Sequence, residues 1–104
     1  MSNPYPRENE LETIQKWDLL EKPVTELLEY VRQLWEYDDR FILTGKRLTG
    51  KRVLRLYLST GGWSGNESII GALQQNILFW SLCWVKSQSG GHYWFVINLS
   101  QFRG

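Results

Sequence analysis

An apolar stripe at helical spacing, between Pro23 and Asp38, most limits what this chain can fold into. Its members recur at i, i+3, i+4 and i+7, which predicts an amphipathic helix with one buried face; they are Val24, Leu27, Leu28, Val31, Leu34 and Trp35. Pro23 suits the first turn of this helix, and Asp38-Asp39 is predicted to end it. A shorter helix is predicted over roughly residues 9–21, where Leu11, Ile14, Trp17 and Leu20 recur at similar spacing.

The pattern changes after residue 40 to the two-residue period of β-strands. The strand predicted over 53–58 places Leu54, Leu56 and Leu58 on one face and Val53, Arg55 and Tyr57 on the other. Two five-residue repeats, 43–47 and 48–52, predict a hairpin that joins it to Phe41-Ile42-Leu43.

The remaining segments alternate between the two patterns. Residues 64–76 are predicted to form a third helix, which Asn76 ends as a left-handed cap. The apolar runs 77–85 and 93–99, on either side of the turn 87–91, predict a second hairpin with aromatic-rich strands.

The resulting order, α-α-β-β-α-β-β, predicts an α+β fold. We expect a mostly antiparallel four-stranded sheet with the helices on one face. A chain of 104 residues fits one core, so residues 9–104 are predicted to form a single domain behind a disordered lead, 1–8. The sequence shows neither an apolar run of spanning length nor a signal-peptide pattern, so no membrane partner and a cytoplasmic location are expected.

Charge is divided unevenly along the chain. Residues 1–40 carry ten acids and five bases, and residues 41–104 carry one acid and seven bases, which gives the two parts about −5 and +6. One interpretation is that the acidic helical part docks on the basic sheet part. The other is a basic surface that receives an anion, with a cluster on the first hairpin comprising Lys46, Arg47, Lys51, Arg52 and Arg55.

The stretch 59–68, between a predicted strand and a predicted helix, is the strongest candidate for a functional site. Three glycines within five residues permit positive φ, and Ser64 with Glu67 matches a capping box. Backbone N–H groups at the start of the helix favour an anion, and Trp63 is suited to stacking on a base. The predicted ligand-binding residues are Thr60, Gly61, Gly62, Trp63, Ser64, Gly65, Asn66, Glu67, His92, Tyr93, Lys51, Arg52 and Arg55.

No catalytic residue, metal site or cofactor is expected. Cys83 and His92 would stand about 13–20 Å apart in the predicted hairpin, too far for a nucleophile and its base. Cys83 is therefore predicted to be a buried core or sheet residue. Ser64 lacks the second glycine of a nucleophile elbow, since Asn66 stands in its place, so a small hydrolase is only a third hypothesis.

Two distinctive strings carry a resemblance to other proteins. The run Gly61-Gly62-Trp63-Ser64-Gly65-Asn66-Glu67 and the run Gly90-Gly91-His92-Tyr93-Trp94, with Phe79-Trp80 between them, resemble uncharacterised small proteins of phages and prophages over roughly residues 53–97. The resemblance implies a setting in the bacterial cytoplasm. It also implies binding of a host component, such as a defence protein or its nucleotide signal.

Two functional hypotheses follow, both for a non-enzymatic binding protein. In the first, a phosphate-bearing nucleotide lies at the turn 60–67, with Trp63 or Tyr93 stacked on its base. In the second, the same aromatic and basic surface anchors and inhibits a host protein. Nucleic acid is a further possible partner but is not favoured, and homo-oligomers are left open.

Overall fold

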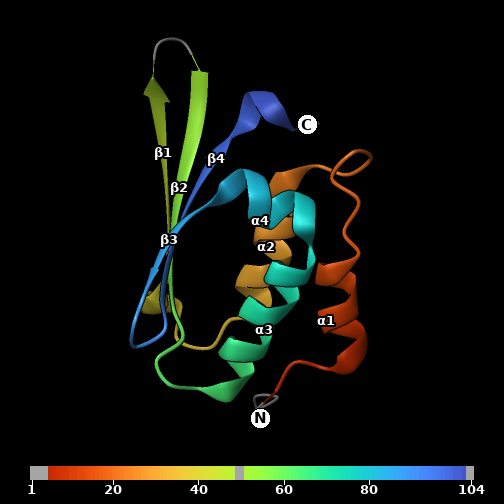
Figure 1. Ribbon diagram of the computed structural model, residues 1–104, viewed down its shortest axis with the longest axis vertical. Coiled ribbons are helices and arrows are strands. Elements are labelled where there is room, and N and C mark those ends of the chain that lie inside the picture. The colour runs from red at the N-terminus through yellow and green to blue at the C-terminus, as the bar shows by residue number, and fades with distance from the viewer. Residues whose placement is uncertain (1–4, 49–50, 103–104) are drawn as a thin grey trace.

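The computed structural model describes residues 5–48 and 51–102, and they form a helical layer packed on one face of a four-stranded sheet (Figure 1). The predicted α+β architecture is confirmed. The helices are α1 (Glu8–Gln15), α2 (Val24–Leu34), α3 (Ser64–Gln75) and α4 (Ile77–Cys83), and the strands are β1 (Phe41–Leu48), β2 (Lys51–Ser59), β3 (Trp84–Gln88) and β4 (His92–Asn98). Short 3-10 turns precede β1, at Asp38–Arg40, and follow β4, at Leu99–Gln101.

The sheet is antiparallel throughout, with strand order β1-β2-β4-β3. The first hairpin is confirmed by its register, which runs from Phe41 opposite Leu58 to Leu48 opposite Lys51. Residues 49 and 50 of the repeat lie outside the described residues. In the central pair, Leu56 stands opposite Phe95, so the apolar faces of β2 and β4 coincide.

The core lies between the sheet and the helices. The predicted stripe of α2 is buried at Val24, Leu27, Leu28 and Val31, and α3 buries Ile69, Ile70 and Leu73. The sheet contributes the face predicted for β2, with Leu56 and Leu58 almost fully buried. Phe79 packs against Phe95 at a ring distance of 5.6 Å and joins the helical layer to the sheet.

The N-terminal segment differs from the prediction in its boundaries. Tyr5 already stacks on Trp63, and Glu8 begins α1. The helix ends at Gln15, earlier than predicted, because Asp18 Oδ1 accepts a hydrogen bond from the backbone of Leu20 and fixes a turn instead. Leu20 is consequently 72 % exposed, and Leu19 is the buried residue of this turn.

Helix α2 also has shorter bounds than the sequence indicates. Pro23 is its N-cap, with φ of −61° and ψ of 139°, and does not lie within its first turn. The extended backbone of Trp35 ends the helix before Asp38-Asp39 is reached, and these acids lie in the following 3-10 turn.

The apolar run 77–85 is a helix followed by a strand, so its prediction as one strand was wrong. Asn76 decides this, because its side chain accepts a hydrogen bond from the backbone of Phe79 and caps α4. The Asn76 backbone is not left-handed, with φ of −81°. Its amide also donates to the carbonyl oxygens of Ile14, at 2.9 Å, and Trp17, at 3.1 Å, which ties the start of α4 to the end of α1.

Within the described residues, no helix combines the length and the apolar character needed to cross a membrane.

Candidate functional site

The glycine-rich turn lies at one end of the sheet, beside the turn of the second hairpin. Gly61 and Gly62 have φ of 63° and 77°, the left-handed conformation that the glycines were predicted to permit. The backbone N–H of Thr60 donates to the carbonyl of Gly91 at 2.9 Å. The two motifs singled out in the sequence therefore meet in space.

The start of α3 is built differently from the predicted capping box. Trp63 is the N-cap, and no side chain caps the helix, so Ser64 is its first residue and is not its cap. Thr60 instead holds the turn, because its carbonyl accepts from the backbone of Trp63 at 3.1 Å. Glu67 is exposed in the first turn, where its carboxylate would compete with an incoming anion.

The Trp63 ring is occupied by contacts within the protein. It lies over Gly65, where an added Cβ atom would clash with the ring, and it stacks on Tyr5 with the ring centroids 5.5 Å apart and the planes 13° from parallel. Gly65 is thus required for close packing. Neither Trp63 nor Gly65 presents the open surface that stacking on a base requires.

Asn66 is a structural anchor. Its side chain is fully buried, and its amide donates to the carbonyls of Glu36, at 3.0 Å, and Thr60, at 3.3 Å. Its Oδ1 accepts from the backbone N–H of Glu36 at 3.0 Å. Both N–H groups of this amide donate inside the fold and its oxygen accepts there, so the side chain has no N–H left to donate to a ligand.

The predicted basic residues of the site lie away from the turn. Lys51 is at the opposite end of β2 from Ser59, eight residues away, which corresponds to about 26 Å along a strand. Arg52, seven residues from Ser59, is nearly as remote, and Arg55 stands midway along β2. The combination of the turn 60–67 with Lys51, Arg52 and Arg55 in one site is therefore not supported by the geometry.

His92 and Tyr93 lie on opposite faces of the sheet. Tyr93 faces the helices and meets the Trp80 ring edge-on, so the prediction that it stacks on a ligand is not supported. His92 lies on the outer face, where its Nδ1 and the Tyr57 hydroxyl share a hydrogen bond of 2.6 Å. Their rings stack 5.9 Å apart.

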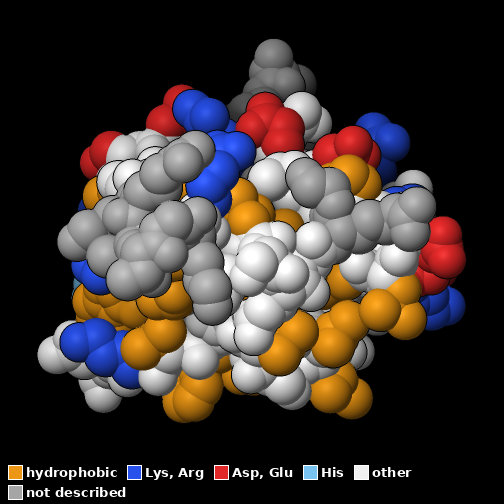
Figure 2. Space-filling model, turned by 90° about the horizontal axis from the view of Figure 1, so that it is seen from above, with side chains coloured by type: hydrophobic (Ala, Val, Ile, Leu, Met, Phe, Trp, Pro, Cys, Tyr) orange, Lys and Arg blue, Asp and Glu red, His pale blue; other side chains and the backbone are white. Residues whose placement is uncertain are grey.

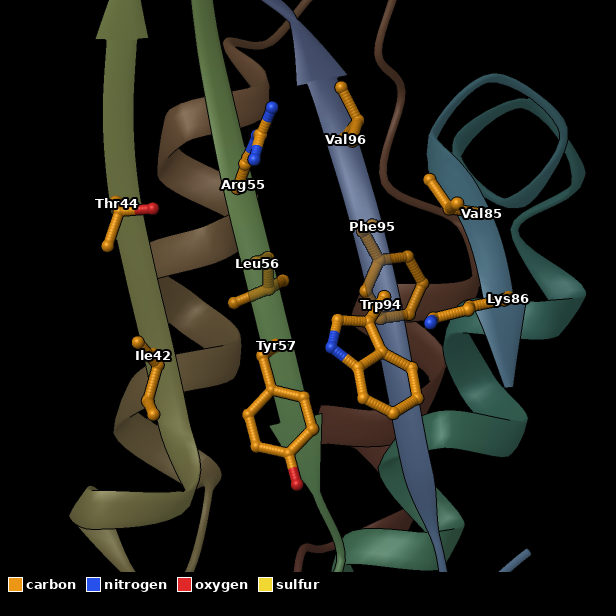
Figure 3. A pocket seen from close by; sticks show the side chains of 10 residues that line it. All are labelled: Ile42, Thr44, Arg55, Leu56, Tyr57, Val85, Lys86, Trp94, Phe95 and Val96. Carbon is orange, nitrogen blue, oxygen red and sulfur yellow. The ribbon is translucent and has the colours of Figure 1, made fainter. Parts of the chain in front are cut away.

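The outer face of the sheet carries an aromatic row that the sequence interpretation missed. The Tyr57 ring lies 5.1 Å from the Trp94 ring, and His92 continues the row on the side of the turn. Lys86 places its ammonium 4.6 Å above the centre of the Trp94 ring. Figure 3 shows Tyr57, Trp94 and Lys86 on one surface that no helix covers.

A shallow groove of about 270 Å³ runs across this outer face. We call it the outer groove; it is lined by Ile42, Thr44, Arg55, Leu56, Tyr57, Val85, Lys86, Trp94, Phe95 and Val96. Ile42, Val85 and Val96 expose 47 %, 51 % and 37 % of their surface, so the lining is apolar, with a cation on either side. The volume is just under the roughly 300–1,000 Å³ of ligand pockets and suits one planar group.

The strands that carry the outer groove have a net positive charge. The four strand segments contain six lysines and arginines and no acidic residue. Anions approaching this face therefore meet no opposing carboxylate from the strands. Together with the aromatic row, this charge favours a ligand that joins a planar ring to a negative group.

Cys83 is buried at the end of α4, as the sequence predicts for a core residue, but on a helix. Burial raises the pKa of its thiol from 9.0 to about 12, so the thiolate is almost absent near neutral pH. Such a thiol is a poor nucleophile. Among the described residues, no group of three or more histidine, cysteine or acidic side chains could hold a metal ion.

We expect Cys83 to resist thiol reagents at pH 7–8 in the folded protein and to react rapidly after unfolding in urea. The raised pKa also stabilises the fold below pH 9, and this contribution is lost as the pH rises from 9 towards 12, since only the unfolded thiol ionises there. The labelling rate of the folded and of the unfolded protein is measured from the absorbance of the coloured group that a chromogenic thiol reagent releases. Equal labelling rates with and without urea would contradict the burial.

Searches of family models, curated proteins and solved structures find no match to this chain. The implied relation to phage proteins therefore stays a prediction, and the functional argument depends on the outer face of the sheet.

Proposed function

We propose that the protein is a non-enzymatic binding protein that holds a phosphate-bearing nucleotide in the outer groove. The base stacks on the aromatic row of Tyr57 and Trp94, and Lys86 and Arg55 contact the phosphate. The observation that carries the proposal is the aromatic row on an uncovered sheet face, with Lys86 over Trp94 and Arg55 also lining the groove. Nucleotide-binding surfaces combine these two features, because every base has a π-face and every phosphate a charge.

Lys86 covers the Trp94 ring before a nucleotide binds and has to move when the base stacks there. In the unbound protein its ammonium lies over the Trp94 ring, a cation–π contact worth about 0.5–1 kcal/mol on an exposed surface. A base that stacks on Trp94 displaces the ammonium, which then remains within reach of the attached phosphate. The cost of displacement is small compared with the roughly 1–3 kcal/mol of base stacking.

The same groove would suit a protein partner if its exposed apolar side chains served as anchors. Ile42, Val85 and Val96 favour this second candidate, because partners fill such apolar depressions with large side chains. The two candidates differ in salt dependence. Phosphate contacts weaken steeply with salt, whereas apolar anchors do not.

Calorimetry with mono-, di- and cyclic nucleotides at low and high salt tests the proposal. We expect binding that weakens with salt, and we expect Trp94→Ala to remove about 1–3 kcal/mol through lost stacking. Lys86→Gln and Arg55→Gln should each reduce the salt dependence, since each removes a cation that contacts phosphate.

Trp63→Ala is the matched control, because Trp63 is also a half-buried tryptophan but stacks on Tyr5 at the glycine-rich turn. It should leave nucleotide affinity unchanged. If Trp63→Ala abolishes binding and Trp94→Ala does not, the site is the turn 60–67 and the outer groove is excluded. Absence of heat from every nucleotide would reject the nucleotide proposal and leave a protein partner.

A further inference from the structure

The outward face of α4 is a second apolar surface, separate from the outer groove. At 100° per residue, Phe79 and Cys83 point into the core, while Ile77, Leu78, Ser81 and Leu82 share the opposite side of the helix. We call Ile77, Leu78, Leu82 and Trp84 the α4 patch. They expose 74 %, 41 %, 40 % and 42 % of their surface, and the segment 77–85 contains no charged residue.

Side-chain contacts hold both ends of α4 in place. Asn76 fixes the start of α4, and Trp80 stacks on Trp84 with ring centroids 6.0 Å apart at its end. The adjacent strand β3 is the edge of the sheet and pairs only with β4 within the described chain. In the view of Figure 2, hydrophobic side chains gather along the lower margin of the molecule, where no acidic side chain is visible.

We infer that the α4 patch is the interface of a symmetric dimer of this chain. The four side chains expose roughly 400 Å² of apolar surface, which is within the range of patches that mark interaction sites. One side of a standard interface covers about 800 Å², and in homodimers about 65 % of it is apolar. The half-buried Trp80 lies beside the patch and adds to the area that such an interface requires.

The absence of charge favours a second copy over other occupants. Homodimer interfaces are depleted of charge at their centre, and two identical uncharged surfaces meet without repulsion across a twofold axis. A membrane is a poor alternative, because α4 has only seven residues and neither it nor the rest of 77–85 offers a lysine or arginine for lipid headgroups. A nucleic acid would likewise find no cation on this surface.

Sedimentation velocity from low to high micromolar concentration tests the inference. The expected mass is twice the chain mass of 12.3 kDa. Ile77→Glu should raise the dissociation constant at least tenfold, and Ile77→Glu combined with Leu82→Glu should give a monomer. Nucleotide affinity of the double variant should be unchanged, because neither residue lines the outer groove.

Leu20→Glu is the matched control, since Leu20 is 72 % exposed, almost the same as Ile77, but lies outside the α4 patch. It should leave the dimer intact. Melting curves of each variant verify folding, and if the glutamate variants do not fold, Ile77→Ser with Leu82→Ser replaces them. A monomeric wild type at high micromolar concentration, a dimer that persists in the double variant, or equal loss in Leu20→Glu would each overturn the inference.

Cross-linking gives an independent measurement. Under oxidising conditions, Ile77→Cys should form a disulfide between two copies more readily than Leu20→Cys. Cys83 does not interfere, because it is buried. Equal cross-linking by the two variants would show that the contacts are random.

Discussion

Truncating Leu28 or Leu73 to alanine is expected to lower the free energy of unfolding by about 2–5 kcal/mol. Both side chains are at most 2 % exposed, and they belong to the core between the helical layer and the sheet. Removing either leaves a cavity in addition to the lost apolar burial. Urea denaturation followed by tryptophan fluorescence and circular dichroism measures the change.

Leu20→Ala provides the comparison for these core variants. It removes the same atoms from a side chain that is 72 % exposed, so its effect should stay within about 0.5 kcal/mol. A Leu28→Ala or Leu73→Ala protein as stable as the wild type would contradict the packing of the helical layer on the sheet.

Replacing Asn66 with alanine is expected to cost about 2–4 kcal/mol, since it removes three hydrogen bonds and leaves the backbone N–H and carbonyl of Glu36 without the Asn66 side chain as partner. Asn66→Asp should also destabilise, because the carboxylate keeps the acceptor but loses the two donated hydrogen bonds. The free energy of unfolding from urea titration is the measurement.

Ser68→Ala is the control for Asn66, because Ser68 lies on the same helix with an exposed hydrogen bond to Ser64. Its effect should be near zero. The experiment also separates the two roles considered for Asn66. If Asn66 binds a ligand, the substituted protein should lose affinity at unchanged stability. If Asn66 is a structural anchor, the substituted protein should lose stability first.

The helices α2 and α3 and the first hairpin could be predicted because periodic apolar residues dominate those segments. The run 77–85 misled the prediction because all its residues but Ser81 and Cys83 are large apolar residues, so both helix and strand periods fit it. The signal that distinguishes a helix here is twofold. Phe79 and Cys83 are four residues apart, about one helical turn, and Asn76 precedes them as an N-cap. A polar residue on the exposed side of α4 would have made this period visible.

The candidate site was predicted only in part. Alternation placed Arg55 and Tyr57 on one face of β2, which is correct, but the same alternation was not applied to His92 and Trp94 on β4. Those residues reach Tyr57 only through the pairing of β2 with β4, which fixes Tyr57 opposite Trp94. A single strand sequence does not contain that register, and the conspicuous glycines drew attention to Trp63 instead.

The division of charge gives the molecule a permanent electric dipole moment. Most acidic residues lie on α1 to α3 and their connections, while the strands carry six basic residues and no acidic one, so the moment runs from the helical layer towards the sheet. In the electric field of a polyanion, the molecule is oriented with its sheet towards the polyanion. Encounters in which the sheet faces a polyanion are then more frequent than random tumbling allows. Added salt screens this field, so it slows association with a polyanion before it speeds dissociation.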